Sequence, residues 1–120
     1  MPIIHVSETG KQDTQKKRDF MGFAANSICS HTNTLPKNIY VYFHEMEPEN
    51  VRKTAPTART DWTMIPDRTN EAKKAIMGEL TDELAKLTGE KRSEIAITFN
   101  DIPLPNAMLG GITRADNYNW

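Results

Sequence analysis

An internal repeat is the feature that most constrains the fold of this chain. Residues 39–46 resemble residues 95–102, and four pairs of apolar or acidic side chains match: Ile39 with Ile95, Val41 with Ile97, Phe43 with Phe99, and Glu45 with Asp101. Residues 13–17 resemble residues 70–74 at almost the same spacing. Two separate matches at nearly one spacing predict a duplicated unit of about 57 residues. The full length of 120 residues is close to two such units.

Each unit has the pattern of a strand, a helix and a second strand. In the first unit we predict strands over residues 2–7 and 39–43, and a helix that begins at Asp13 or Thr14. In the second unit we predict strands over residues 62–65 and 95–99, and a helix that Thr69 caps and Gly89 ends. Two such βαβ units predict an α/β (α+β) fold, a four-stranded mixed sheet with both helices on one face.

Prolines and turn residues divide this single domain (residues 1–120) into three parts. We predict a first unit over residues 1–46, a linker over 47–61, and a second unit over 62–120. Within the second unit, the turn-rich residues 103–112 predict a small hairpin. The polar tail after it contains two aromatic residues, and we expect it to pack on a neighbouring subunit or to stay loose.

Charge and composition exclude several classes of function. The 15 Lys and Arg residues against 16 Asp and Glu residues give a net charge of −1, so we expect no nucleic-acid partner and no membrane anchor. No apolar run approaches the roughly 18 residues of a membrane-spanning helix, and the single cysteine excludes an internal disulfide. We therefore expect a soluble, cytoplasmic protein. Because the hydrophobic fraction of 38 % is low, we expect an oligomer to bury the uncovered face of the sheet.

Pro2 is the residue best suited to chemistry. Removal of Met1, which precedes a small residue, would leave a secondary amine at the head of a buried strand. A free α-amino group titrates at roughly 8, and burial or nearby cations lower that pKa. Such a nitrogen is a neutral general base at pH 7 without help from lysine or histidine. The plain alternative is that Met-Pro is a common start without function.

The strand that begins at Pro2, the Gly10-Lys11 turn, the amphipathic helix and the second strand together resemble the tautomerase superfamily, whose type member is 4-oxalocrotonate tautomerase. The repeat resembles the fused members, in which two βαβ units share one chain. Residues 109–111, Leu-Gly-Gly, resemble the family's final hairpin. The resemblance implies a cofactor-independent tautomerase or isomerase for small enol or keto carboxylic acids. It also implies a homotrimer with Pro2 as the general base.

The same resemblance implies a set of substrate-binding residues. A carboxylate substrate needs a cation, and the family places an arginine in the loop after the first strand of a unit. Arg68 in the second unit is the preferred match, and Lys11 in the first unit is the second choice. Tyr42 and Glu45 resemble residues that handle water in the cis-3-chloroacrylic acid dehalogenase branch, although there the strand belongs to the second unit.

Two other functions stay open at the level of sequence. A protonated Pro2 would act as an acid in a hydratase, a dehalogenase or a decarboxylase, on unsaturated or β-keto acids. A non-catalytic trimeric binding protein of the same fold is the third reading, and Tyr40 and Ala96 support it because the type member has an arginine at the matching position. We expect no cofactor, and no metal because the three histidines lack the spacing of ligands.

Overall fold

The structure, a computed structural model, describes residues 1–117, and its main element is a four-stranded mixed sheet. The strands are β1 (Ile3–Thr9), β2 (Tyr40–Met46), β3 (Thr57–Thr63) and β4 (Ala96–Ile102), in the order β2-β1-β3-β4. β1 is parallel to β2 and β3 is parallel to β4, whereas β1 and β3 pair antiparallel at the centre. Each parallel pair is one βαβ unit, and the antiparallel pair joins the two units.

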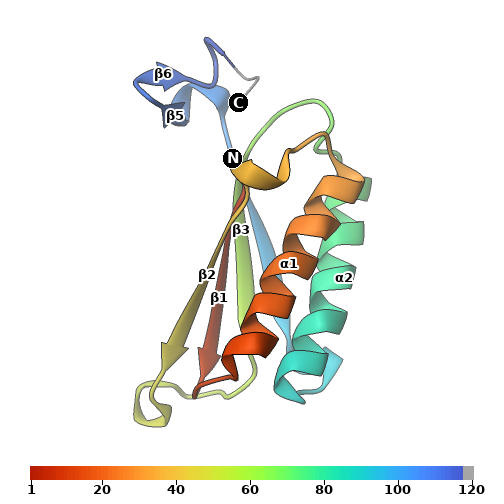
Figure 1. The fold of residues 1–120 in the computed structure, drawn as a ribbon, viewed down its shortest axis with the longest axis vertical. Helices are drawn as coiled ribbons and strands as arrows, with labels where there is room; N and C mark the ends of the chain where they lie inside the picture. The colour runs from red at the N-terminus through yellow and green to blue at the C-terminus, as the bar shows by residue number, and fades with distance from the viewer. Residues whose placement is uncertain (118–120) are drawn as a thin grey trace.

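Two helices cover one face of this sheet and lie side by side (Figure 1). α1 (Thr14–His31) begins after Asp13, whose carboxylate accepts hydrogen bonds from two backbone N–H groups of the first turn. α2 (Asn70–Thr88) begins after Thr69, whose hydroxyl caps the first turn in the same way. Gly89 ends α2 with a φ of 76°, a conformation that glycine adopts without strain. The predicted α+β fold of two βαβ units, with both helices on one face, is therefore confirmed.

The third strand differs from its predicted position. We expected a strand over residues 62–65, but β3 runs from Thr57 to Thr63 and so includes residues that we assigned to the linker. Its helix-facing side chains are Ala58, Thr60 and Trp62, all buried. Two of these three are small or polar, so the strand lacks the alternation of large apolar residues that marks a half-buried strand. β2 and β4 also end three residues later than predicted.

The predicted C-terminal hairpin is confirmed. β5 (Met108–Leu109) pairs antiparallel with β6 (Ile112–Thr113), and the turn between them consists of Gly110 and Gly111. Both glycines have positive φ angles, 60° and 80°, which side chains with a Cβ rarely adopt. Residues 118–120 lie outside the described part of the chain, so the expectation for the tail is not addressed.

The hydrophobic core lies between the helices and the sheet. Its buried members come from both units and include Ile4, Ile28, Trp62, Ile76 and Leu80, each without exposed surface. The opposite face of the sheet carries polar and aromatic side chains, among them exposed tyrosines on β2. Within residues 1–117, neither helix is long and apolar enough to span a bilayer.

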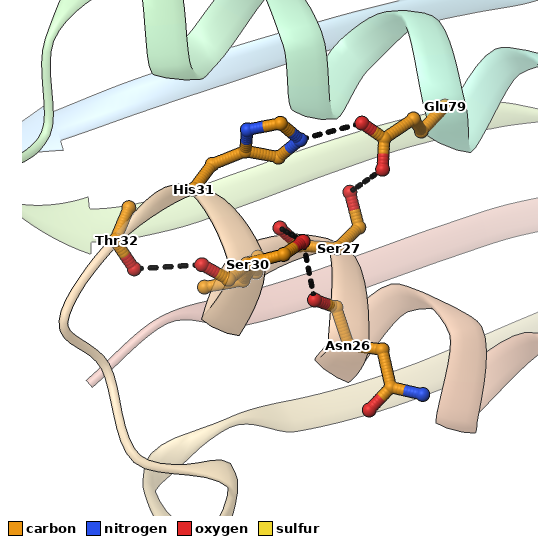
Figure 2. Close-up of polar contacts among 7 residues, drawn as sticks. Asn26, Ser27, Ser30, His31, Thr32 and Glu79 are labelled. Carbon is orange, nitrogen blue, oxygen red and sulfur yellow. Dashed lines mark hydrogen bonds and ion pairs between the residues drawn. The ribbon is translucent and has the colours of Figure 1, made fainter.

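A polar contact also connects the two helices (Figure 2). The Glu79 carboxylate of α2 accepts a hydrogen bond from Ser27 Oγ at 3.1 Å and meets His31 Nε2 at 2.5 Å. The Ser30 and Thr32 hydroxyls donate back to carbonyl oxygens of α1 itself. The last turn of α1 is thereby held against α2.

Leu80→Ala tests the shared core. Leu80 of α2 is fully buried in the core that the two units share. Its truncation should therefore lower the free energy of unfolding by about 2–5 kcal/mol. Leu35→Ala is the matched control, because that side chain is 52 % exposed. Urea denaturation followed by circular dichroism measures both variants, and equal losses in the two would contradict the assignment of this core.

Candidate active site

Three segments from distant parts of the chain meet at one end of the sheet. In the antiparallel register Ile3 lies opposite Asp61, so the chain start lies beside the end of β3. The loop over residues 64–68 leaves β3 at this end, and the hairpin follows β4 here because Trp62 pairs with Asp101 near the end of β4. Figure 1 shows the amino terminus beneath β5 and β6.

Pro2 is held rigidly at this end. Its side chain is less than 2 % exposed, and its carbonyl oxygen accepts a hydrogen bond from Tyr40 N–H at 3.0 Å. The α-amino group of Met1, one residue earlier, has its pKa lowered from 8.0 to about 5 by burial, with further lowering by Arg68 and Arg114. The Met1 amine is therefore mainly neutral at pH 7.

Arg68 is a buried cation beside the amino terminus. Its Nη1 donates to the Thr63 carbonyl oxygen at 2.8 Å and to Thr63 Oγ1 at 2.9 Å, and its Nη2 donates to Thr34 Oγ1 at 3.3 Å. Its guanidinium lies 5.2 Å from the centre of the Trp62 ring. Burial lowers the pKa of Arg68 to about 10, so it remains charged at pH 7. Its buried Nε has no hydrogen-bond partner among residues 1–117, which leaves this N–H for a ligand.

Arg114 is a second buried cation at this end, and sequence reasoning missed it. It follows β6, and its side chain is only 2 % exposed. Burial lowers the pKa of Arg114, while the nearby Asp67 carboxylate acts in the opposite direction. The only sequence signal was an arginine next to the predicted Gly-Gly hairpin. No local pattern relates residue 114 to the amino terminus.

The other three predicted binding residues lie elsewhere in the chain. Lys11 follows the far end of β1 and is exposed; a seven-residue strand places it roughly 20 Å from Pro2. Glu45 lies at that far end too, where it accepts hydrogen bonds from Lys17 Nζ at 2.7 Å and from the Gln12 backbone N–H, in the loop between β1 and α1, at 2.8 Å. Tyr42 lies in the middle of β2 and stacks on His5 with ring centroids 5.6 Å apart. The structure thus brings only Arg68 to Pro2.

The far end of the sheet is a diverged copy of the Pro2 end. There, Lys17 pairs with Glu45 at 2.7 Å, as Lys73 pairs with Asp101 at 2.8 Å near Pro2. The strand position that Trp62 holds in β3 belongs in β1 to a glutamate, Glu8, which is 2 % exposed. Burial, then repulsion from Glu45, raises the pKa of Glu8.

A second proline lies at the far end of the sheet. Pro56 precedes β3 as Pro2 precedes β1, and it is also buried. Its nitrogen is an amide in the middle of the chain, and removal of Met1 would leave it so. The Pro2 end combines the amino terminus with two buried arginines, whereas the far end has the buried carboxyl group of Glu8. Across residues 1–117, no group of three or more His, Cys, Asp or Glu side chains is arranged to hold a metal ion.

Comparison with known proteins identifies the class. Residues 63–116 match the family model described as "Tautomerase enzyme". The chain is similar to the structure of Pt0534 inactivated by 2-oxo-3-pentynoate, at 19 % identity and a TM-score of 0.84, with 94 % of this chain and 96 % of that chain covered. It is similar to native fused 4-OT (4-oxalocrotonate tautomerase), at 16 % identity and a TM-score of 0.83, with 98 % and 99 % covered.

A more distant likeness extends to Leishmania major MIF2, at 11 % identity and a TM-score of 0.77, with 94 % of this chain and 97 % of that chain covered. A search of curated protein sequences found no match. At these low identities the solved structures establish the fold alone. The family model adds a match at the level of sequence for residues 63–116. Residues 63–116 thus match the tautomerase family by sequence, and the whole chain has the tautomerase fold. Its two βαβ units give it the same architecture as fused 4-OT.

The electrostatics of this site predict the titration of the amino-terminal nitrogen. Its pKa should lie below 8.0, and Arg68→Met should raise it, because a nearby cation disfavours the protonated amine. An NMR titration of the α-proton of the first residue measures both. Arg59→Met is the control, because that side chain of β3 is 55 % exposed on the open face. A wild-type pKa at or above 8.0 would contradict this description of the site.

Proposed function

We propose that this protein is a cofactor-independent tautomerase for small enol or keto carboxylic acids. The Pro2 nitrogen, free after removal of Met1, is the general base, and Arg68 binds the substrate carboxylate. One observation carries the proposal: burial, and then the nearby Arg68 and Arg114, lower the pKa of the Met1 amine, which lies one residue before Pro2. The match of residues 63–116 to the tautomerase family model supports the same reaction type.

The proposed reaction moves one proton within the substrate. The neutral Pro2 nitrogen takes the proton from the enol oxygen and becomes a secondary ammonium, and the negative charge spreads over the enolate. The ammonium then returns the proton to carbon, which gives the keto acid and restores the amine. A positioned base of this kind contributes about 10²–10⁴ in rate. Arg68, held by Thr63 and Thr34, supplies a fixed positive charge that needs no rearrangement during the reaction.

We propose a homotrimer as the working assembly. Two lines of support are the uncovered sheet face of the chain and the similar solved structures of fused 4-OT proteins, which are described as trimers. Lys11, Tyr42 and Glu45 lie away from Pro2 within one chain, so they take part only where a neighbouring copy brings them to it. The proposal for Pro2 and Arg68 does not depend on them.

The hydratase, dehalogenase and decarboxylase alternatives are less favoured because they need a protonated Pro2. Burial and two nearby cations oppose that protonation. The non-catalytic alternative keeps the fold and predicts no turnover at all. Two experiments distinguish these alternatives from a tautomerase: the turnover of the Pro2→Ala variant and the pH dependence of kcat/KM.

Pro2→Ala should lower kcat/KM for phenylenolpyruvate by about 10²–10⁴, because a more mobile primary amine replaces the ring-held secondary amine that is the proposed general base. Pro56→Ala is a matched control, since this proline has the equivalent place in the second unit but no free amine. It should retain wild-type kcat/KM. Mass spectrometry of the intact proteins verifies that Met1 is absent from the wild type. Wild-type turnover by the Pro2→Ala variant would exclude the mechanism.

The pH dependence of kcat/KM distinguishes a mechanism in which Pro2 is a base from one in which it is an acid. Because the reactive amine must be neutral, kcat/KM should rise with pH up to the lowered pKa of the amine and then stay constant through pH 7 and 8. An acid mechanism gives the opposite profile, in which kcat/KM falls as the pH passes the same pKa. Steady-state kinetics from pH 4 to pH 9 distinguish the two, and the acidic limb should move to higher pH in Arg68→Met.

A further inference from the structure

We propose that Trp62 is a positioning residue for Arg68: its indole ring, fixed by the Asp101 carboxylate, holds the Arg68 guanidinium beside the amino terminus. This inference rests on the proposed function, in which Arg68 binds the substrate carboxylate. It gives Trp62 a part in the reaction although its side chain, which has no exposed surface, touches no substrate.

The contact between Trp62 and Arg68 is the first step of the argument. The Arg68 guanidinium lies over the Trp62 ring, 5.2 Å from its centre, and Arg68 is only 8 % exposed. A cation over an indole is attracted by the negative face of the ring, and the attraction grows where water is excluded. The hydrogen bonds to Thr63 and Thr34 fix two nitrogens of the guanidinium. The indole therefore adds a third contact that restricts this flat group.

Asp101 fixes the indole in turn. Trp62 and Asp101 are paired in the register of β3 and β4, and Trp62 Nε1 donates to Asp101 Oδ1 at 2.6 Å. The other carboxylate oxygen accepts a hydrogen bond from Lys73 Nζ at 2.8 Å. Lys73, and then Trp62, hold the pKa of Asp101 below its usual range, so the carboxylate is ionised at pH 7. An ionised acceptor strengthens the hydrogen bond and polarises the ring, which increases its attraction for Arg68.

The far end of the sheet shows which part of this network is particular to the amino-terminal end. Both ends have a lysine–carboxylate pair between helix and outer strand. At the far end, however, Glu45 accepts its other hydrogen bond from the Gln12 backbone N–H, and Glu8 stands in the place of Trp62. The lysine–carboxylate pair is thus common framework, whereas the indole link belongs to the end with the buried arginine.

Trp62→Phe tests the inference, because it keeps a buried ring and removes the N–H that Asp101 holds. We expect KM for phenylenolpyruvate to rise about 2- to 30-fold with kcat unchanged at pH 8, because a displaced Arg68 binds the carboxylate less well throughout the reaction. The acidic limb of kcat/KM should move to higher pH, because a displaced cation lowers the pKa of the amine less. A merely structural role would lower kcat through loss of folded protein and leave KM and the acidic limb unchanged.

Two further variants complete the comparison. Asp101→Ala frees the indole at a side chain that is 33 % exposed, so it leaves the core intact and should change KM and the acidic limb in the same direction. Phe20→Leu is the matched control, because Phe20 is a buried aromatic residue that packs on Phe43 with ring centroids 5.6 Å apart. It should lose stability and keep the wild-type KM and pH profile. Wild-type values in Trp62→Phe or in Asp101→Ala would overturn the inference.

The double variant shows whether Trp62 acts through Arg68. If it does, Trp62→Phe changes KM in the wild-type background but not in the Arg68→Met background. Equal changes in both backgrounds would contradict the positioning role.

An NMR titration of the amino-terminal nitrogen tests the same role without turnover. Trp62→Phe should raise the pKa of this nitrogen, and it should cause no further rise in Arg68→Met. An unchanged titration in Trp62→Phe would exclude the inference. Failure of the proposed function appears separately, as wild-type turnover of phenylenolpyruvate by Pro2→Ala, and the titration then still decides the role of Trp62.

Discussion

The antiparallel pairing of β1 with β3 is the contact on which the rest of the structure depends. Within each unit the two strands are parallel. Both strands of a unit therefore begin at one end of the sheet, and the loop that leads from the first strand into the helix lies at the other end. The central pairing reverses one unit against the other. Pro2 of the first unit thereby meets Arg68 of the second, and a lone unit cannot form this site.

The same pairing creates two related ends, and their chemistry has diverged. Both ends keep a lysine–carboxylate ion pair between helix and outer strand. Only one end has the amino terminus and two buried arginines, whereas the other has Glu8 in the place of Trp62. A duplicated fold can thus keep the same framework at both ends while only one end acquires two buried cations.

The features that sequence predicted are those with a local physical signal. The caps Asp13, Thr69 and Gly89 were predictable because each acts on the backbone of its own helix end. The hairpin was predictable from its Gly-Gly turn. β3 was misplaced because Ala58 and Thr60 are buried without being large or apolar. Their burial comes from helices that lie far away in the sequence.

The site was predictable in part for the same reason. Pro2 stands out because removal of Met1 would give it a free secondary amine wherever it lies in the fold, and the family resemblance pointed to Arg68. Arg114 had no such signal, since its importance depends on a contact with the opposite end of the chain. The sequence by itself determined the repeat, both helices and the presence of a proline next to Met1. Only the tertiary structure decided which cations lie beside the amino terminus, because the antiparallel pairing and the folded hairpin bring them together across more than one unit.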